Sequence, residues 1–104
     1  MTGGVDIGFS AADLEAACPT AVEVEGRYLV VGQADAGLFA IEDMCSHAAC
    51  RFSTDGEIDG GVAICNCHGS EFDLFSGEVL APPAREAIRV FQVNESSGEV
   101  KVRL

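Results

Sequence analysis

Two short Cys/His pairs constrain this chain more than any other feature. The first is Cys45-Ser-His47, and the second is Cys65-Asn-Cys67-His68. Thiolate sulfur and imidazole nitrogen are good ligands for transition metals. Both histidines of the chain fall in these pairs, which leaves little room for a histidine that is simply buried in a core. The sequence therefore predicts one metal site whose ligands come from two separate loops.

The two pairs resemble the ligand set of Rieske proteins, in which cysteines hold one iron of a [2Fe–2S] cluster and histidines hold the other. By this resemblance, Cys45 and Cys65 bind one iron, and His47 and His68 bind the second. Neutral imidazoles remove two of the four negative charges that a set of four thiolates would bring, so the reduction potential rises. The resemblance implies one cluster per chain and transfer of one electron at a time.

A structural zinc ion is the main alternative, because two cysteines and two histidines also satisfy a tetrahedral ion. Zinc ribbons and fingers usually pair two cysteines or two histidines within one short loop. Here each loop contributes one cysteine and one histidine. This arrangement favours the cluster over zinc and over a chain without metal.

Runs of alternating apolar residues, separated by turn residues, predict short antiparallel strands. One run around Gly60-Gly61 can pair Glu57–Asp59 with Val62–Ile64. Such a hairpin would bring the loop before it and the loop after it side by side, so that the two Cys/His pairs could meet. The other predicted elements are a hairpin of 21–25 and 28–31, a strand at 38–41, a hairpin of 87–93 and 100–104 with a longer loop at 94–98, and a helical turn at 10–17.

Length and charge limit the range of functions. At 104 residues the chain predicts a single domain. Its net charge of -11 disfavours nucleic acid and anionic membranes, and favours basic protein partners by long-range steering. No export signal is evident after Met1, and no apolar run approaches the roughly 18 residues of a membrane span. We therefore expect a cytoplasmic monomer.

The resemblance extends along most of the chain to the Rieske ferredoxins that serve bacterial multicomponent oxygenases. It is carried by 39–43, by Cys65-x-x-His-Gly-Ser-x-Phe-Asp, by 76–79 and by 80–84. It implies an all-β Rieske fold, an antiparallel β-sandwich with a small cluster-binding subdomain at about residues 43–83. It also implies that Pro82-Pro83 covers the cluster, although an ordinary turn at a sheet edge would explain these prolines equally well.

Two extra cysteines depart from the usual ferredoxin pattern. Cys50 and Cys67 occupy positions that, in the high-potential Rieske subunits of cytochrome bc complexes, hold a disulfide between the loops. That resemblance implies a Cys50–Cys67 bridge, whereas a reducing cytosol favours two buried thiols. Cys18 has no evident partner and is most simply a core or turn residue.

Two further positions bear on the reduction potential. Ser70 resembles the high-potential serine that donates a hydrogen bond to a bridging sulfide. Phe72 stands where those proteins have a tyrosine that bonds a ligand sulfur. The resemblance therefore implies a potential between the extremes of the Rieske range.

The resemblance implies a one-electron carrier between a flavin-dependent reductase and a terminal oxygenase, and not an enzyme by itself. Two alternatives stay open from the sequence. One is a small Rieske subunit of a larger oxidoreductase. The other is a redox-sensing or iron–sulfur-assembly accessory protein, in which Cys50 and Cys67 would switch between dithiol and disulfide.

Overall fold

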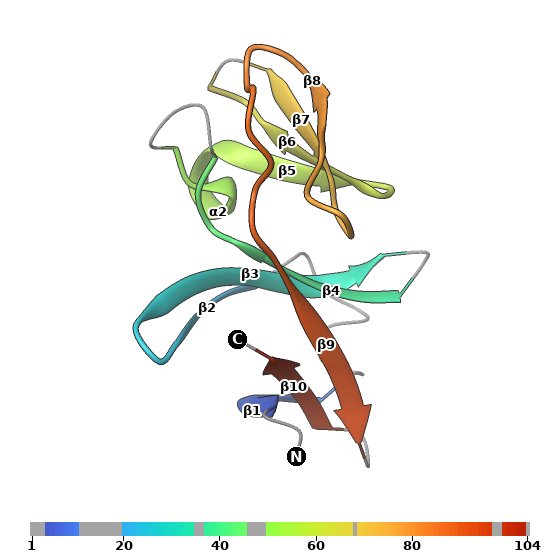
Figure 1. The fold of residues 1–104 in the computed structure, drawn as a ribbon. Helices are drawn as coiled ribbons and strands as arrows, with labels where there is room; N and C mark the ends of the chain where they lie inside the picture. The colour runs from blue at the N-terminus through green and yellow to red at the C-terminus, as the bar shows by residue number, and fades with distance from the viewer. Residues whose placement is uncertain are drawn as a thin grey trace.

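The molecule contains two antiparallel sheets, and the smaller sheet lies beyond one end of the larger one (Figure 1). A computed structural model describes residues 4–10, 20–34, 37–45, 50–67, 69–96 and 99–103. The elements of these residues are β1 (Gly4–Ser10), β2 (Thr20–Val24), β3 (Arg27–Ala34), β4 (Gly37–Glu42), α2 (Phe52–Asp55), β5 (Gly56–Asp59), β6 (Val62–Cys65), β7 (Ser70–Asp73), β8 (Val79–Ala81), β9 (Val90–Ser96) and β10 (Glu99–Arg103).

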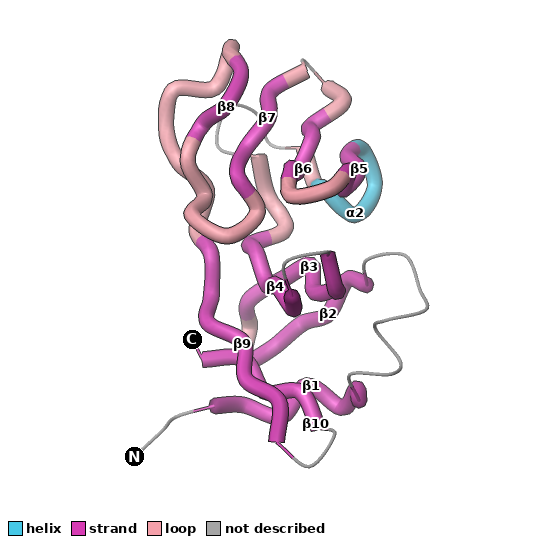
Figure 2. Tube along the Cα trace, turned by 90° about the vertical axis from the view of Figure 1, so that its right-hand side faces the viewer, coloured by secondary structure: helices cyan, strands magenta, loops and turns pink. Residues whose placement is uncertain are grey.

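The larger sheet has the strand order β1-β10-β9-β4-β3-β2, and the smaller has the order β5-β6-β7-β8. Every strand pairing is antiparallel. Figure 2 shows β5 to β8 and α2 gathered in one lobe, beyond the strands of the larger sheet. This architecture confirms the expected all-β fold built from antiparallel sheets.

The hairpin of β2 and β3 confirms the first predicted strand pair. Val24 pairs with Arg27 across the two-residue turn of Glu25 and Gly26. Both turn residues have positive φ, at 50° and 81°. Positive φ at both central residues defines a type I′ turn, whose twist matches that of the flanking strands. Glycine adopts a positive φ without steric cost, so Gly26 is well suited to this position.

Strands β3 and β4 lie between two hydrophobic cores. Successive side chains of a strand point to opposite faces. Leu29, Val31 and Ala40 accordingly pack in one core with Val100 and Val102 of β10. The intervening residues of the same two strands face the other core, which extends into the lobe of the smaller sheet; they are Val30, Phe39 and Ile41. The continuous apolar run Leu29–Val31 thus reflects burial on both faces.

Two sequence predictions about the last hairpin are wrong in detail. β9 begins at Val90 and not at residue 87. The backbone before Val90 forms its hydrogen bonds outside the sheet, because the Ile88 N–H donates to the Gly77 carbonyl. The pairing also continues to Ser96 opposite Glu99. The strands therefore extend into the loop that the sequence predicted at 94–98.

Two short elements, β1 and α2, were not predicted from the sequence. β1 was not predicted, although Val5, Ile7 and Phe9 alternate with other residues. α2 is a single turn with no distinct pattern. The helical turn predicted at 10–17 lies outside the described residues, apart from Ser10, which ends β1. No helix in the described ranges is both long and apolar enough to cross a bilayer.

Candidate metal centre

The hairpin of β5 and β6 brings the two cysteine-bearing loops together. Ile58 pairs with Ala63, and Asp59 with Val62, across the Gly60-Gly61 turn, as the sequence predicts. The same register places Gly56, which follows α2, opposite Cys65. Because an antiparallel pair aligns the start of one strand with the end of the other, the segment before β5 lies beside the segment after β6.

Cys45 and Cys65, the two predicted cysteine ligands, are both free, buried thiols in the structure. Cys65 ends β6, and Cys45 follows β4, where its N–H donates to the Cys50 carbonyl at 2.9 Å. Their exposed fractions are 3% and 2%. Both belong to the core that extends into the smaller lobe. Water is therefore largely excluded from both sulfurs, a setting in which metal–thiolate bonds are protected.

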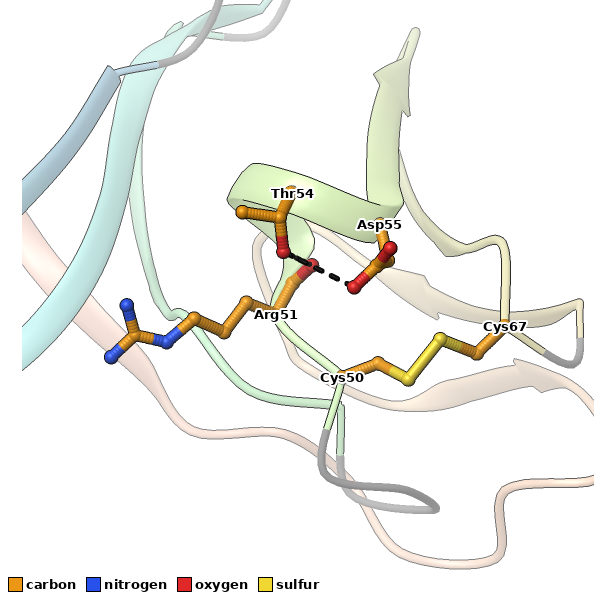
Figure 3. The surroundings of a disulfide bond; sticks show 5 residues. All are labelled: Cys50, Arg51, Thr54, Asp55 and Cys67. Atoms are coloured by element: carbon orange, nitrogen blue, oxygen red, sulfur yellow. Dashed lines mark hydrogen bonds between the residues drawn. A yellow bond between two sulfur atoms is a disulfide. The ribbon is translucent and has the colours of Figure 1, made fainter.

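A disulfide between Cys50 and Cys67 joins the two loops (Figure 3). Their Cα atoms are 6.7 Å apart, and their sulfurs 2.01 Å. The sulfurs of Cys50, Cys65 and Cys67 all lie within 4.8 Å of one another. Two of these three are held in the bridge, so the thiol of Cys65 is the member that can bind a metal. The bridge limits how far the loops can separate.

His47 and His68 lie outside the described residues, as does Cys18. Of the four predicted ligands, the structure describes the two cysteines, which are buried thiols on two covalently joined loops. Thiolates are the ligands that iron–sulfur clusters prefer. The chemistry of these residues therefore fits an iron–sulfur cluster.

Ser70 connects this site to the proline-containing loop. It begins β7 directly opposite Cys65, so the two side chains share one face of the sheet. Its side chain is fully buried, and its Oγ accepts a hydrogen bond from the Ala84 N–H at 3.0 Å. A serine hydroxyl that accepts one hydrogen bond can still donate its own proton. Ser70 can therefore donate on the cysteine-bearing face.

The loop of Pro82 and Pro83 is anchored through the residue that follows it. Both prolines are exposed, and the peptide bond between them is cis. Ala84 is buried and bonded to Ser70. The anchor fixes the loop next to β7, beside the strand that carries Cys65. That the loop covers the cluster stays a prediction.

Phe72 is part of the core. It is fully buried in β7, and its ring meets that of Phe52 edge to face, with 5.8 Å between centroids. This arrangement matches the preferred geometry of aromatic pairs. The contact secures α2, and with it the segment after Cys50, against the smaller sheet.

Asp43 is a structural residue whose role the sequence did not reveal. It is 2% exposed and lies two residues before Cys45. Its carboxylate accepts hydrogen bonds from the Ser53 N–H at 2.8 Å and from the Ser53 hydroxyl. Asp43 and Ser53 are ten residues apart and belong to no local sequence motif. Only the fold shows that Asp43 connects the first loop to α2 through hydrogen bonds.

Replacing Ser70 by alanine is expected to destabilise the protein by about 1–3 kcal/mol, because the buried N–H of Ala84 would lose its acceptor. Urea unfolding of the two proteins would measure the difference. The variant Ser76→Ala, on the exposed turn before β8, is the matched control and should cost less. Equal losses for both variants would contradict the role assigned to Ser70.

Asp73 holds the turn between β7 and β8. Its Oδ1 accepts the N–H groups of Ser76 and Phe75, both at 2.9 Å. These bonds, the one from Ser76 first, lower the pKa of Asp73 from its ordinary 3.8, and burial opposes them. The ionised carboxylate is therefore the form that the fold favours.

Because the pKa of Asp73 is lower in the folded state than in the unfolded state, its ionised carboxylate stabilises the fold above pH about 4. This stabilisation is lost as the pH falls through the folded-state pKa. We expect Asp73→Asn, which keeps an acceptor oxygen but no charge, to lack this component. Unfolding free energies at pH 7 and pH 3 would test it: the wild type should lose more stability than the variant. An identical pH dependence would show that the charge contributes nothing.

Comparison with known proteins gives three findings. The model of the Rieske [2Fe-2S] domain matches residues 7–92. The ferredoxin component of the naphthalene 1,2-dioxygenase system from Pseudomonas aeruginosa is 30% identical over 83 residues, 80% of this chain and 79% of the relative. The ferredoxin of carbazole 1,9a-dioxygenase from Nocardioides aromaticivorans IC177 superimposes with a TM-score of 0.87 at 26% identity, over 99% of this chain and 98% of that chain.

A solved complex of reduced oxygenase and oxidized ferredoxin in carbazole 1,9a-dioxygenase also contains a similar chain. The TM-score is 0.85 at 29% identity, and the match covers 96% of this chain and 92% of that one. The likeness thus extends over nearly the whole of both molecules.

Proposed function

Because the chain belongs to the Rieske [2Fe-2S] domain family, we propose that it is a one-electron carrier that takes electrons from a flavin-dependent reductase and passes them to a terminal oxygenase. The cofactor of this family is a [2Fe–2S] cluster, which supplies the reversible uptake of a single electron. The observation that carries the proposal is the pair of buried thiols, Cys45 and Cys65, on two bridged loops.

Four side chains would hold the cluster in this proposal. Cys45 and Cys65 would bind one iron, and His47 and His68 the other. The burial of both thiols supports the first half of this set. For the second half, the support is the spacing of each histidine from its cysteine within the same loop. The unit that carries all four would be the subdomain at about residues 43–83, within a single domain of 1–104.

Similar proteins support the proposed partners. The relatives compared above are named as ferredoxin components of dioxygenase systems, and one similar chain comes from a complex with an oxygenase. In such a system the chain would be an electron-transfer component and not an enzyme. We propose that it works in the cytoplasm as a monomer, where its net charge of -11 would steer basic-faced partners toward it.

Ser70 would tune the cluster in this role. A hydroxyl that donates to a cluster sulfur stabilises the reduced, more negative state and so raises the potential. Ser70→Ala should therefore lower the midpoint by tens of millivolts, since about 59 mV corresponds to a tenfold change for one electron. Voltammetry would measure it. Phe72 carries no donor, so Phe72→Tyr, which adds a hydroxyl donor, should raise the midpoint by tens of millivolts.

Spectroscopy of the purified protein tests the proposal directly. The isolated protein should be red-brown and contain two irons per chain, as a [2Fe–2S] centre requires. After reduction it should give a rhombic paramagnetic signal whose average g lies below that of an all-cysteine cluster. Colourless protein with stoichiometric zinc would overturn the proposal.

Variants then assign the ligands. His47→Ala and His68→Ala should each lose the cluster or change its spectrum, because a nitrogen ligand is removed. Cys18→Ala is the matched control, since Cys18 lies outside the proposed set, and it should keep the wild-type spectrum. Reduction by a flavin-dependent reductase, followed by oxidation by an oxygenase, would establish the electron route.

A further inference from the structure

Three arginines, Arg27, Arg51 and Arg89, line one hollow of about 270 Å³, which we call the arginine hollow. The chain has six lysines and arginines against 17 acidic residues, so half of its lysine and arginine residues line this hollow. Arg27 begins β3, Arg51 precedes α2, and Arg89 precedes β9. The hollow thus lies where the larger sheet meets the segments that connect it to the smaller lobe. The other lining residues are Tyr28, Leu29, Glu42, Asp43, Met44 and Phe91.

The two carboxylates that line the hollow already accept hydrogen bonds from other groups of the chain. Glu42 accepts the backbone N–H of Arg89 at 2.8 Å, and Asp43 accepts both hydrogen bonds from Ser53. Among the residues whose side chains the structure describes, no carboxylate oxygen lies within the 4.0 Å ion-pair distance of the guanidinium groups of Arg27, Arg51 or Arg89. Each guanidinium offers five N–H donors, so these groups can bind an external anion.

Arg51 is positioned for such binding before any ligand arrives. Its guanidinium carbon lies 4.3 Å from the centroid of the Tyr28 ring. The side chain extends away from the disulfide (Figure 3). Its backbone carbonyl accepts the N–H groups of Thr54 and Asp55. A guanidinium that lies on an aromatic face keeps its edge donors available. Because the stack and the one-turn helix restrain it, Arg51 loses little freedom on binding.

Exposed apolar side chains accompany the arginines. Tyr28 is 50% exposed and Met44 is 40% exposed, and both line the hollow. Tyrosine, methionine and arginine are enriched in protein interfaces, and tyrosine and arginine also in their energetic hot spots. A bare inorganic anion would use the arginines but not these apolar groups. The composition therefore fits a peptide segment better than a small ion.

We propose that the arginine hollow docks a short acidic segment of a partner protein. The carboxylates of the segment would pair with Arg27, Arg51 and Arg89, for which the fork of a guanidinium is well shaped. An apolar side chain between them would pack against Tyr28 and Met44. The net charge of -11 disfavours a wholly acidic partner, so the segment belongs to a partner that is otherwise neutral or basic. This inference does not depend on the electron-carrier proposal.

The test uses the cluster-loaded full chain and a blocked peptide, Glu-Glu-Phe-Glu-Glu, titrated at low salt by calorimetry. The triple variant Arg27→Ala, Arg51→Ala, Arg89→Ala should weaken binding at least tenfold, or about 1.4 kcal/mol. The matched control is Arg85→Ala, Lys101→Ala, Arg103→Ala, which removes the same charge from residues that do not line the hollow. This control should stay within about threefold of the wild type, since screened distant charges contribute little.

Further readouts locate the binding and check the fold. The circular dichroism and absorption of both triple variants should match those of the wild type. Amide NMR shifts on peptide addition should concentrate at Tyr28, Leu29 and Phe91. A triple variant with Arg27, Arg51 and Arg89 changed to lysine keeps the charge and should recover only part of the affinity.

Three results would overturn the proposal. The first is no saturable binding at millimolar peptide. The second is equal weakening in the two alanine triple variants, which would show that net charge alone attracts the peptide. The third is displacement by inorganic phosphate at concentrations near the peptide dissociation constant, which would make the hollow a small-anion site.

Discussion

Replacing Gly77 by alanine is expected to destabilise the protein by about 3 kcal/mol, a large part of the roughly 5–15 kcal/mol that stabilises a typical domain. Gly77 has a φ of +80°, which alanine rarely adopts. A Cβ atom there would lie 2.3 Å from the Ile88 carbonyl oxygen. That backbone cannot move away easily, because the Ile88 N–H donates to the Gly77 carbonyl at 3.0 Å. Denaturant unfolding would measure the loss.

Gly60→Ala is the matched control. Gly60 also has a positive φ, at +63°, but a Cβ atom there would have no neighbour within 4 Å. Only the backbone penalty applies, so we expect a cost of about 1 kcal/mol. If both variants lose the same stability, the contact between Gly77 and Ile88 is not what restricts position 77.

Removing the disulfide should have an effect of similar size. Cys50 and Cys67 are separated by 17 residues, and a bridge that closes a loop of about this length stabilises by about 3 kcal/mol in the chain-entropy account. The double variant Cys50→Ser, Cys67→Ser should therefore unfold more easily by about 2–4 kcal/mol. Thermal or denaturant unfolding of cluster-loaded protein would show it.

Reductant provides the control for this prediction. Wild-type protein treated with a thiol reductant should lose about as much stability as the double variant, and the variant itself should not respond. Non-reducing mass mapping should find Cys50 joined to Cys67, while Cys18 alkylates after unfolding. Alkylation of both Cys50 and Cys67 in protein kept from reductants would contradict the bridge.

Local sequence signals were sufficient for most of the strands. The turns at Glu25-Gly26 and at Gly60-Gly61 were predictable because each places a glycine between two runs of apolar residues. Gly26 and Gly60 do adopt the positive φ that such turns require. The burial of β3 on both faces also follows from its unbroken run of apolar residues. The end of β9 was misassigned because Asn94 and Ser96 are typical turn residues that the pairing with β10 keeps in the sheet.

Long-range contacts explain what the sequence did not reveal. Asp43 and Ser53 meet only because α2 packs beside the first loop, and α2 is too short to leave a periodic pattern. The arginine hollow depends on three residues that are far apart along the chain. The composition shows only that the net charge is negative. It does not indicate which arginines lie close together in the fold.

The position of β3 and β4 between the two cores bears on how such proteins can be recombined. Grafting the smaller lobe of one relative onto the larger sheet of another would cut through a shared core, because Val30, Phe39 and Ile41 pack into that lobe from the larger sheet. A functional chimera should therefore carry these three residues over together with the lobe. The useful crossover points follow the packing and not the ends of the smaller sheet.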